Sequence, residues 1–207
     1  MCKKRQKNDE KELDLILKMS SIGALSALGI VLSFVVVFIP NVEFISFTMF
    51  LIVILFGIKY GLIATVAIAT VYEILVTSVY GSSGLLFIIK LICYILMVII
   101  VGLARKKMMN LSWWEYGVIG ATFAIFYDVT VTIAGISLIF QEALSLEYIT
   151  ILVILGVPFT IIHVVGNFLI FSSLKKIIQW IKNAYQYKGI KFFYLLEEFE
   201  CNDDSSN

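Results

Sequence analysis

Long apolar runs, separated by short polar segments, dominate the pattern of this chain. A helix needs about 20 apolar residues to cross the hydrocarbon core of a bilayer. Six runs approach or reach that length: residues 19–39, 42–58, 60–79, 85–104, 116–140 and 148–174. The ten-residue alternation typical of a membrane β-barrel is absent. Because lipid offers no water to backbone groups, the pattern predicts an all-α integral membrane protein with six transmembrane helices.

The basic residues fall on one side of this predicted arrangement. Of the 16 lysines and arginines, all but Lys90 lie in segments on the same side as the N-terminus. The segments and edges on the other side carry only acidic residues, Glu43, Glu142 and Glu147. The positive-inside rule therefore predicts that both termini are cytoplasmic and that the protein is a multi-pass protein of the cell membrane.

Charge also divides the chain into three regions. Residues 1–18 form a basic cytoplasmic segment, residues 19–174 the six-helix membrane domain, and residues 175–207 a second cytoplasmic region. Lysines and apolar residues alternate at the start of this last region, which predicts an amphipathic continuation of the sixth helix near the inner headgroups. A solvated end with an interfacial tryptophan, Trp180, is the alternative. Residues 197–207 are acidic and are expected to be disordered.

Composition narrows the classes of protein further. Hydrophobic residues make up 60% of the chain and charged residues 15%, against roughly a half and a quarter in soluble domains. This balance argues against a soluble enzyme, a nucleic-acid-binding domain and a disordered chain. The three cysteines, Cys2, Cys93 and Cys201, are too scattered for a disulfide framework or a metal site.

Ionisable residues inside predicted spans are functional candidates by default, because burying them in lipid is costly. Glu73 in the third span and Lys90 in the fourth both lie roughly 8–9 Å below the outer surface, at 1.5 Å per residue. The short loop between these spans makes them antiparallel neighbours, so the two charges can meet. Three interpretations remain open. The two charges contact a solute, they form an ion pair that only locks the hairpin, or the Lys90 side chain extends to the outer interface.

Three further polar residues lie in the last two spans. Asp128 and His163 are both placed near the bilayer midplane, and Asn167 shares a helix face with His163. Hydrogen bonds between spans would account for His163 and Asn167. An ionised carboxylate at mid-depth needs a partner or a proton, so Asp128 is the stronger candidate for a binding site. We predict a solute site in the outer half, formed by Glu73, Lys90, Asp128, His163 and Asn167.

Small residues recur at four-residue spacing on the first span, where Ser20 pairs with Ala24 and Gly23 with Ala27. Such faces let helix backbones approach closely. They predict either internal packing or a docking face for a partner.

Four stretches together resemble the substrate-binding S component of an energy-coupling factor transporter. They are 38–44 (FIPNVEF), 55–61 (LFGIKYG), 126–128 (FYD) and 157–167 (VPFTIIHVVGN), within a resemblance that covers roughly residues 15–182. The resemblance implies capture of a vitamin or similar micronutrient from outside, followed by association with a membrane coupling protein and two cytosolic ATPases. It also implies that the small face of the first span docks the coupling protein. Here Gly23 with Ala27, or Ser20 with Ala24, replaces the family's strict alanine pair.

No phosphate-binding loop of the G-x-x-x-x-G-K-[ST] type occurs, so ATP hydrolysis would come from other chains. Hydrolase and metalloprotease motifs are absent too, including G-x-S-x-G and H-E-x-x-H. Pieces of the sixth span resemble a membrane CAAX-type protease signature, but the only adjacent glutamates, Glu197 and Glu198, lie in the tail. We therefore expect no enzyme activity, no cofactor and no metal.

Two other functions remain as alternatives. A stand-alone ion-coupled transporter or channel would use Asp128, His163, Glu73 and Lys90 as a relay, although the chain is small and shows no internal repeat. A ligand-free membrane scaffold would use the same polar groups for packing alone.

Overall fold

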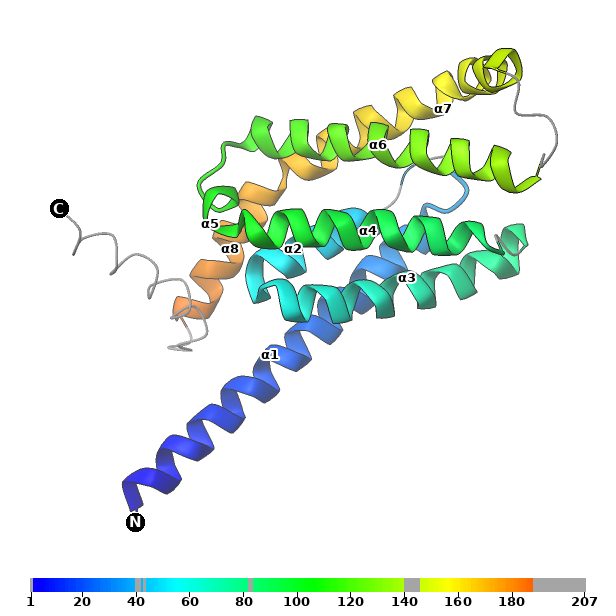
Figure 1. The fold of residues 1–207 in the computed structure, drawn as a ribbon. Helices are drawn as coiled ribbons and strands as arrows, with labels where there is room; N and C mark the ends of the chain where they lie inside the picture. The colour runs from blue at the N-terminus through cyan, green and yellow to red at the C-terminus, as the bar shows by residue number, and fades with distance from the viewer. Residues whose placement is uncertain (1, 40–41, 43, 82–83, 140–145, 188–207) are drawn as a thin grey trace.

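The computed structural model describes residues 2–39, 42, 44–81, 84–139 and 146–187. Within these ranges the chain is helical and contains no strand (Figure 1). The helices are α1 (Cys2–Val35), α2 (Ile45–Phe56), α3 (Ile58–Tyr80), α4 (Leu86–Leu103), α5 (Arg105–Met108), α6 (Trp113–Ile139), α7 (Leu146–Ser172) and α8 (Leu174–Tyr187). The all-α class predicted from the apolar runs is confirmed for this part of the chain.

Five stretches in the described helices are long and apolar enough to cross a membrane. They are Leu15–Val35, Ile58–Tyr80, Leu86–Leu103, Trp113–Ser137 and Ile154–Ile181. At most 28% of the scored window in any of these stretches is buried inside the protein. Apolar helices with so much exposed surface fit a multi-pass membrane protein, because lipid can cover that surface.

The second predicted span differs from the other five. It forms α2, which has 12 residues, all of them buried. At 1.5 Å per residue α2 is about 18 Å long, shorter than the roughly 30 Å hydrocarbon core. A helix that is apolar on every side belongs in the interior. Accordingly, α2 packs against α1, α3 and α4 and also reaches α5, α7 and α8.

Polar groups from other helices hold both ends of α2. At its start, the Phe44 N–H donates to Ser33 Oγ at 2.8 Å. At its end, Arg105 donates from Nε to the Ile54 carbonyl at 2.6 Å and from Nη2 to the Leu55 carbonyl at 2.7 Å. The last carbonyls of a helix lack partners within the helix and attract positive charge. Arg105 supplies both the donors and the charge, and its burial lowers the pKa of the guanidinium.

The remaining helices surround α2 as two neighbouring groups. Helices α1, α3 and α4 pack on one side, and α6 and α7 form a long hairpin that meets the first group mainly through α4 (Figure 1). Glycines allow the close approach within the hairpin region, because a Cβ added at Gly120 would lie 2.5 Å from the Phe171 ring. The N-terminal part of α1 extends away from the bundle (Figure 1).

Both ends of the membrane domain differ from the sequence expectation in detail. Helix α1 begins at Cys2, so the basic segment 2–18 continues directly into the first span. Helix α7 ends at Ser172, and α8 starts as a separate helix at Leu174, although the apolar stretch continues to Ile181. Helix α8 is amphipathic: Leu174 and Ile178 are buried, whereas Trp180 is 73% exposed. The acidic stretch 197–207 lies outside the described residues.

Candidate functional site

A buried carboxylate–imidazole pair joins α6 to α7. His163 Nδ1 lies 2.8 Å from Asp128 Oδ1, and the side chains of His163 and Asp128 are only 3% and 13% exposed. When the carboxylate is ionised, the imidazole donates its Nδ1 proton to Oδ1. The two residues thus give each other the partner that a buried polar group requires.

Hydrogen-bonding capacity is left over beside this pair. Among the residues that the structure describes, Asp128 Oδ2 and Asn167 Nδ2 are buried and have no hydrogen-bond partner. Asn167, one helical turn beyond His163, is 1% exposed. A buried polar atom without a partner costs about 1–3 kcal/mol. A bound solute with a matching group would remove that cost at Asp128.

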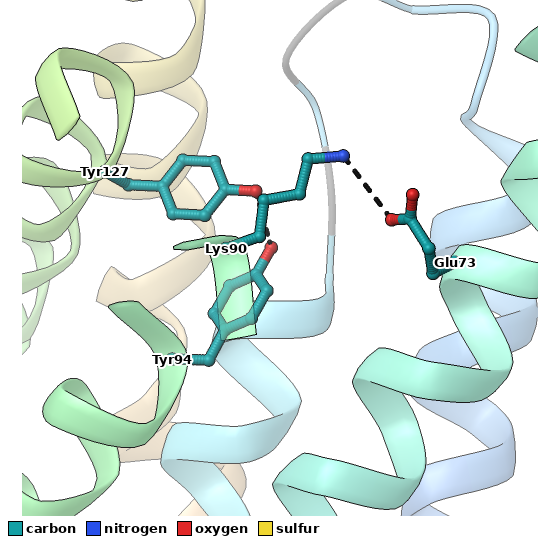
Figure 2. Close-up of polar contacts among 4 residues, drawn as sticks. All are labelled: Glu73, Lys90, Tyr94 and Tyr127. Atoms are coloured by element: carbon teal, nitrogen blue, oxygen red, sulfur yellow. Dashed lines mark hydrogen bonds and ion pairs between the residues drawn. The ribbon is translucent and has the colours of Figure 1, made fainter. Parts of the chain in front are cut away.

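Lys90 and Glu73 form a second, looser pair. Lys90 Nζ lies 3.4 Å from Glu73 Oε2, between α4 and α3 (Figure 2). The contact expected from their equal depth is confirmed. Charge-assisted N–H···O bonds are usually about 2.7–2.9 Å long, so this separation is long for such a bond. The two side chains are 23% and 17% exposed, which leaves the pair within reach of solvent or a solute.

Both pairs border one cavity of about 370 Å³. Lys90, Asp128 and His163 line it directly, whereas Glu73 and Asn167 are not among its lining residues. The cavity lies toward the ends of α3 and α4 that meet near residue 81, at the opposite end of α4 from Arg105. Its volume is at the lower end of the range for small-molecule sites, about 300–1,000 Å³.

Aromatic and small polar side chains complete the cavity wall. Tyr72 and Tyr80 come from α3, Tyr127 from α6 and Phe159 from α7. The Tyr127 ring stacks on Tyr94 with centroids 5.2 Å apart, and the Tyr94 hydroxyl donates to the Tyr127 hydroxyl at 3.2 Å (Figure 2). This contact fixes Tyr127 next to Asp128. Small residues at helical spacing from Asp128 and His163 also face the cavity: Thr132, Gly156 and Thr160.

One wall could not be read from the sequence. Val37, Ile39 and Val42, from the connection between α1 and α2, also line the cavity. The Tyr80 hydroxyl donates to the Val37 carbonyl at 2.8 Å and ties this connection to the end of α3. The apolar pattern predicts spans over 19–39 and 42–58, but α1 ends at Val35 and α2 begins at Ile45, so these three residues fall in the connection instead. The stretch 38–44, which carries part of the family resemblance, is the nearby sequence signal.

The structure brings four of the five predicted site residues into two pairs. Lys90, Asp128 and His163 line the cavity, and Glu73 contacts Lys90. Asn167 is not among the lining residues and lies one helical turn beyond His163. The predicted docking residues lie elsewhere: Ser20, Gly23, Ala24 and Ala27 are all exposed on α1. A Cβ added at Gly23 would meet no atom within 4 Å, whereas one at Gly29 would lie 2.2 Å from Thr48 Oγ1. The internal packing face of α1 therefore includes Gly29 and not Gly23.

The chemistry of the cavity suits binding of a small solute. It presents an ammonium, a carboxylate and an imidazole among aromatic walls. Among the described residues, no three histidines, cysteines or acidic residues gather as a metal site would require. Comparison of the chain with protein-family models, with curated proteins and with solved structures gives no match.

Proposed function

We propose that this chain is the membrane subunit that captures a solute for an ATP-driven importer of the energy-coupling factor type. Its solute would be a vitamin or a similar micronutrient taken from outside the cell membrane. The observation that carries the proposal is the cavity of about 370 Å³ with Lys90, Asp128 and His163 in its wall. The stretches that resemble the S component family support it.

The position of the cavity agrees with capture from outside. The cluster of Arg105, Lys106 and Lys107 follows α4 at the end remote from the cavity. If this basic end is cytoplasmic, as the positive-inside rule requires, the cavity lies in the outer half of the protein. In this orientation both termini are cytoplasmic and α2 completes the six-helix membrane domain from inside the bundle.

The exposed face of α1 supports a partner. Ser20, Gly23, Ala24 and Ala27 lie on the surface although residues of this size suit close helix contacts. In this proposal a membrane coupling protein covers the face and links the chain to two cytosolic ATPases. Those subunits hydrolyse ATP, since this chain has no phosphate-binding loop.

Transport by a reconstituted complex tests the proposal. The tagged chain is purified from its own membranes with its associated subunits, placed in liposomes, and supplied with the solute that co-purifies with it. We expect uptake that requires ATP on the side of the basic loops and that persists when ionophores remove proton and sodium gradients. Uptake by the chain alone, driven by an ion gradient, would overturn the proposal.

Uptake by the chain alone, driven by an ion gradient, is what a second candidate function would produce. A stand-alone ion-coupled transporter is favoured by one observation, the Asp128–His163 pair, because buried acid and histidine groups form proton pathways in membrane proteins. The same liposome experiment separates the two functions: the rival needs no ATP and stops when the ionophore is added.

A further inference from the structure

The two charged groups in the cavity wall are held on separate helices, and each has a partner on a further helix. Lys90 of α4 pairs with Glu73, which does not line the cavity. Asp128 of α6 pairs with His163 of α7. The ring of Tyr94, from the same helix as Lys90, stacks on the ring of Tyr127, which precedes Asp128 on α6. The cavity therefore offers one positive and one negative contact at distinct places.

Each group keeps hydrogen-bonding capacity that a solute can use. Asp128 Oδ2 is buried without a partner among the described residues, and it can only accept when the carboxylate is ionised. Lys90 has three N–H donors, of which one is directed to Glu73 at 3.4 Å. Asp128 Oδ2 can therefore accept a hydrogen bond from a solute, and Lys90 can donate one to a solute.

From this arrangement, which rests on the proposed function, we infer that the solute is a small zwitterion with a ring. Its ammonium or amine N–H donates to Asp128 Oδ2, its carboxylate accepts from Lys90, and its ring lies against Tyr127 and Phe159. The small volume of the cavity limits the solute to a single ring system of modest size.

Other charge classes fit this wall less well. A neutral apolar solute would leave Asp128 Oδ2 buried and unpaired. A solute with only a carboxylate would bring a second negative charge toward Asp128, and one with only an amine would bring a second positive charge toward Lys90. Unmatched charges of this kind are strongly disfavoured in a low-dielectric site. Among these classes only a zwitterion offers a charged donor to Asp128 and a charged acceptor to Lys90.

Matched probes test the inference on the purified full-length chain in lipid nanodiscs at pH 7. One set is tryptophan, tryptamine and indole-3-propionate, and a second is phenylalanine, phenethylamine and 3-phenylpropionate. Within each set only the amine or the carboxylate changes. Equilibrium dialysis with detection by mass spectrometry gives the relative affinities. We expect at least one zwitterion to bind about 30-fold or more tightly than both of its single-charge analogues, as loss of one buried charge contact implies.

Two substitutions assign each end of the zwitterion. Asp128→Asn should reduce the preference for the zwitterion over the carboxylate-only analogue, and Lys90→Gln should reduce its preference over the amine-only analogue. Lys107→Gln, an exposed lysine far from the cavity, serves as the control and should change neither ratio. A merely structural role for Asp128 or Lys90 would weaken all three probes equally and leave the ratios unchanged.

The remaining outcomes overturn the inference. Equal binding of a zwitterion and one of its analogues would show that the cavity does not read both charges, while solute capture itself would stand. Binding of none of the six probes would also reject the inference. It would leave the proposed function to be judged by ATP-dependent uptake of the co-purified solute, so the two failures are distinguishable.

Discussion

The imidazole of His163 and the carboxylate of Asp128 meet at 2.8 Å between Nδ1 and Oδ1, in the middle of two paired helices. This contact forms one wall of the cavity and also holds α6 to α7. A solute that donates a hydrogen bond to Asp128 Oδ2 therefore binds a carboxylate whose other oxygen is already held by His163. A preorganised group of this kind binds more tightly, because less order has to be imposed on binding.

The pair makes a first prediction about stability. His163→Leu removes the donor and leaves Asp128 as an unpaired buried charge, which should lower the free energy of unfolding by about 3–5 kcal/mol. Adding Asp128→Asn to that variant removes the charge and should restore part of the loss. Unfolding of the single and double variants in nanodiscs gives the coupling energy. Equal stability of wild type and His163→Leu would show that the contact is not energetically significant.

The second prediction concerns the loose pair of Lys90 and Glu73. Exchanging the charges, Glu73→Lys with Lys90→Glu, keeps an ion pair but reverses the charge in the cavity wall. We expect a folded protein that binds its co-purifying solute about 30-fold or more weakly, as loss of a buried charge contact implies. Isothermal titration, with thermal unfolding to confirm the fold, measures this. Near-normal affinity in the exchanged protein would show that the pair only locks the α3–α4 hairpin.

A third prediction separates docking from solute binding. Ala24→Leu or Ala27→Leu enlarges the exposed face of α1 and should abolish ATP-dependent uptake, since overpacking costs about 1–3 kcal/mol by analogy with protein cores. Solute binding by the isolated chain should be unchanged, because the face lies outside the cavity. Ala67→Leu, at an exposed alanine of α3, is the matched control and should leave uptake intact. Parallel loss of binding and uptake would mean that the α1 face packs internally.

The fourth prediction uses two glycines of the α6–α7 hairpin. A Cβ at Gly120 would lie 2.5 Å from the Phe171 ring, whereas one at Gly156 would meet nothing within 4 Å. Gly120→Ala should therefore destabilise the protein by about 1–3 kcal/mol, and Gly156→Ala should be close to neutral. Comparison of their unfolding midpoints checks this difference. If both variants unfold like wild type, α6 and α7 do not approach as closely as described.

Much of the helical content follows from the apolar runs, and the exceptions have physical causes. The run 42–58 has the length of a short span, but its helix is buried on all sides because it is apolar on every face. Its boundaries depend on Ser33 and Arg105, which belong to other helices. Contacts between distant segments cannot be read from a local pattern.

The sequence predicts one of the two contacts at the site, between Glu73 and Lys90, but not the other, between Asp128 and His163. Depth along the helices placed Glu73 opposite Lys90, because a short loop fixes the register of antiparallel neighbours. Asp128 and His163 are separated by a longer connection, so their equal depth did not reveal a direct contact. Which residues line the cavity depends on where along each helix the cavity ends. On the shared face of α7 the cavity wall includes His163 but not Asn167, which lies one helical turn farther along.

Identification of co-purified small molecules tests the central claim, solute capture in this cavity, most directly. The full-length chain and its Asp128→Asn variant are purified in parallel from the same cells, with Lys107→Gln, far from the cavity, as a control, and their denatured extracts are compared by mass spectrometry. We predict one solute in near-stoichiometric amount with wild type and Lys107→Gln, and much less of it with Asp128→Asn. No enriched solute with wild type, or equal amounts with the folded Asp128→Asn protein, would contradict it.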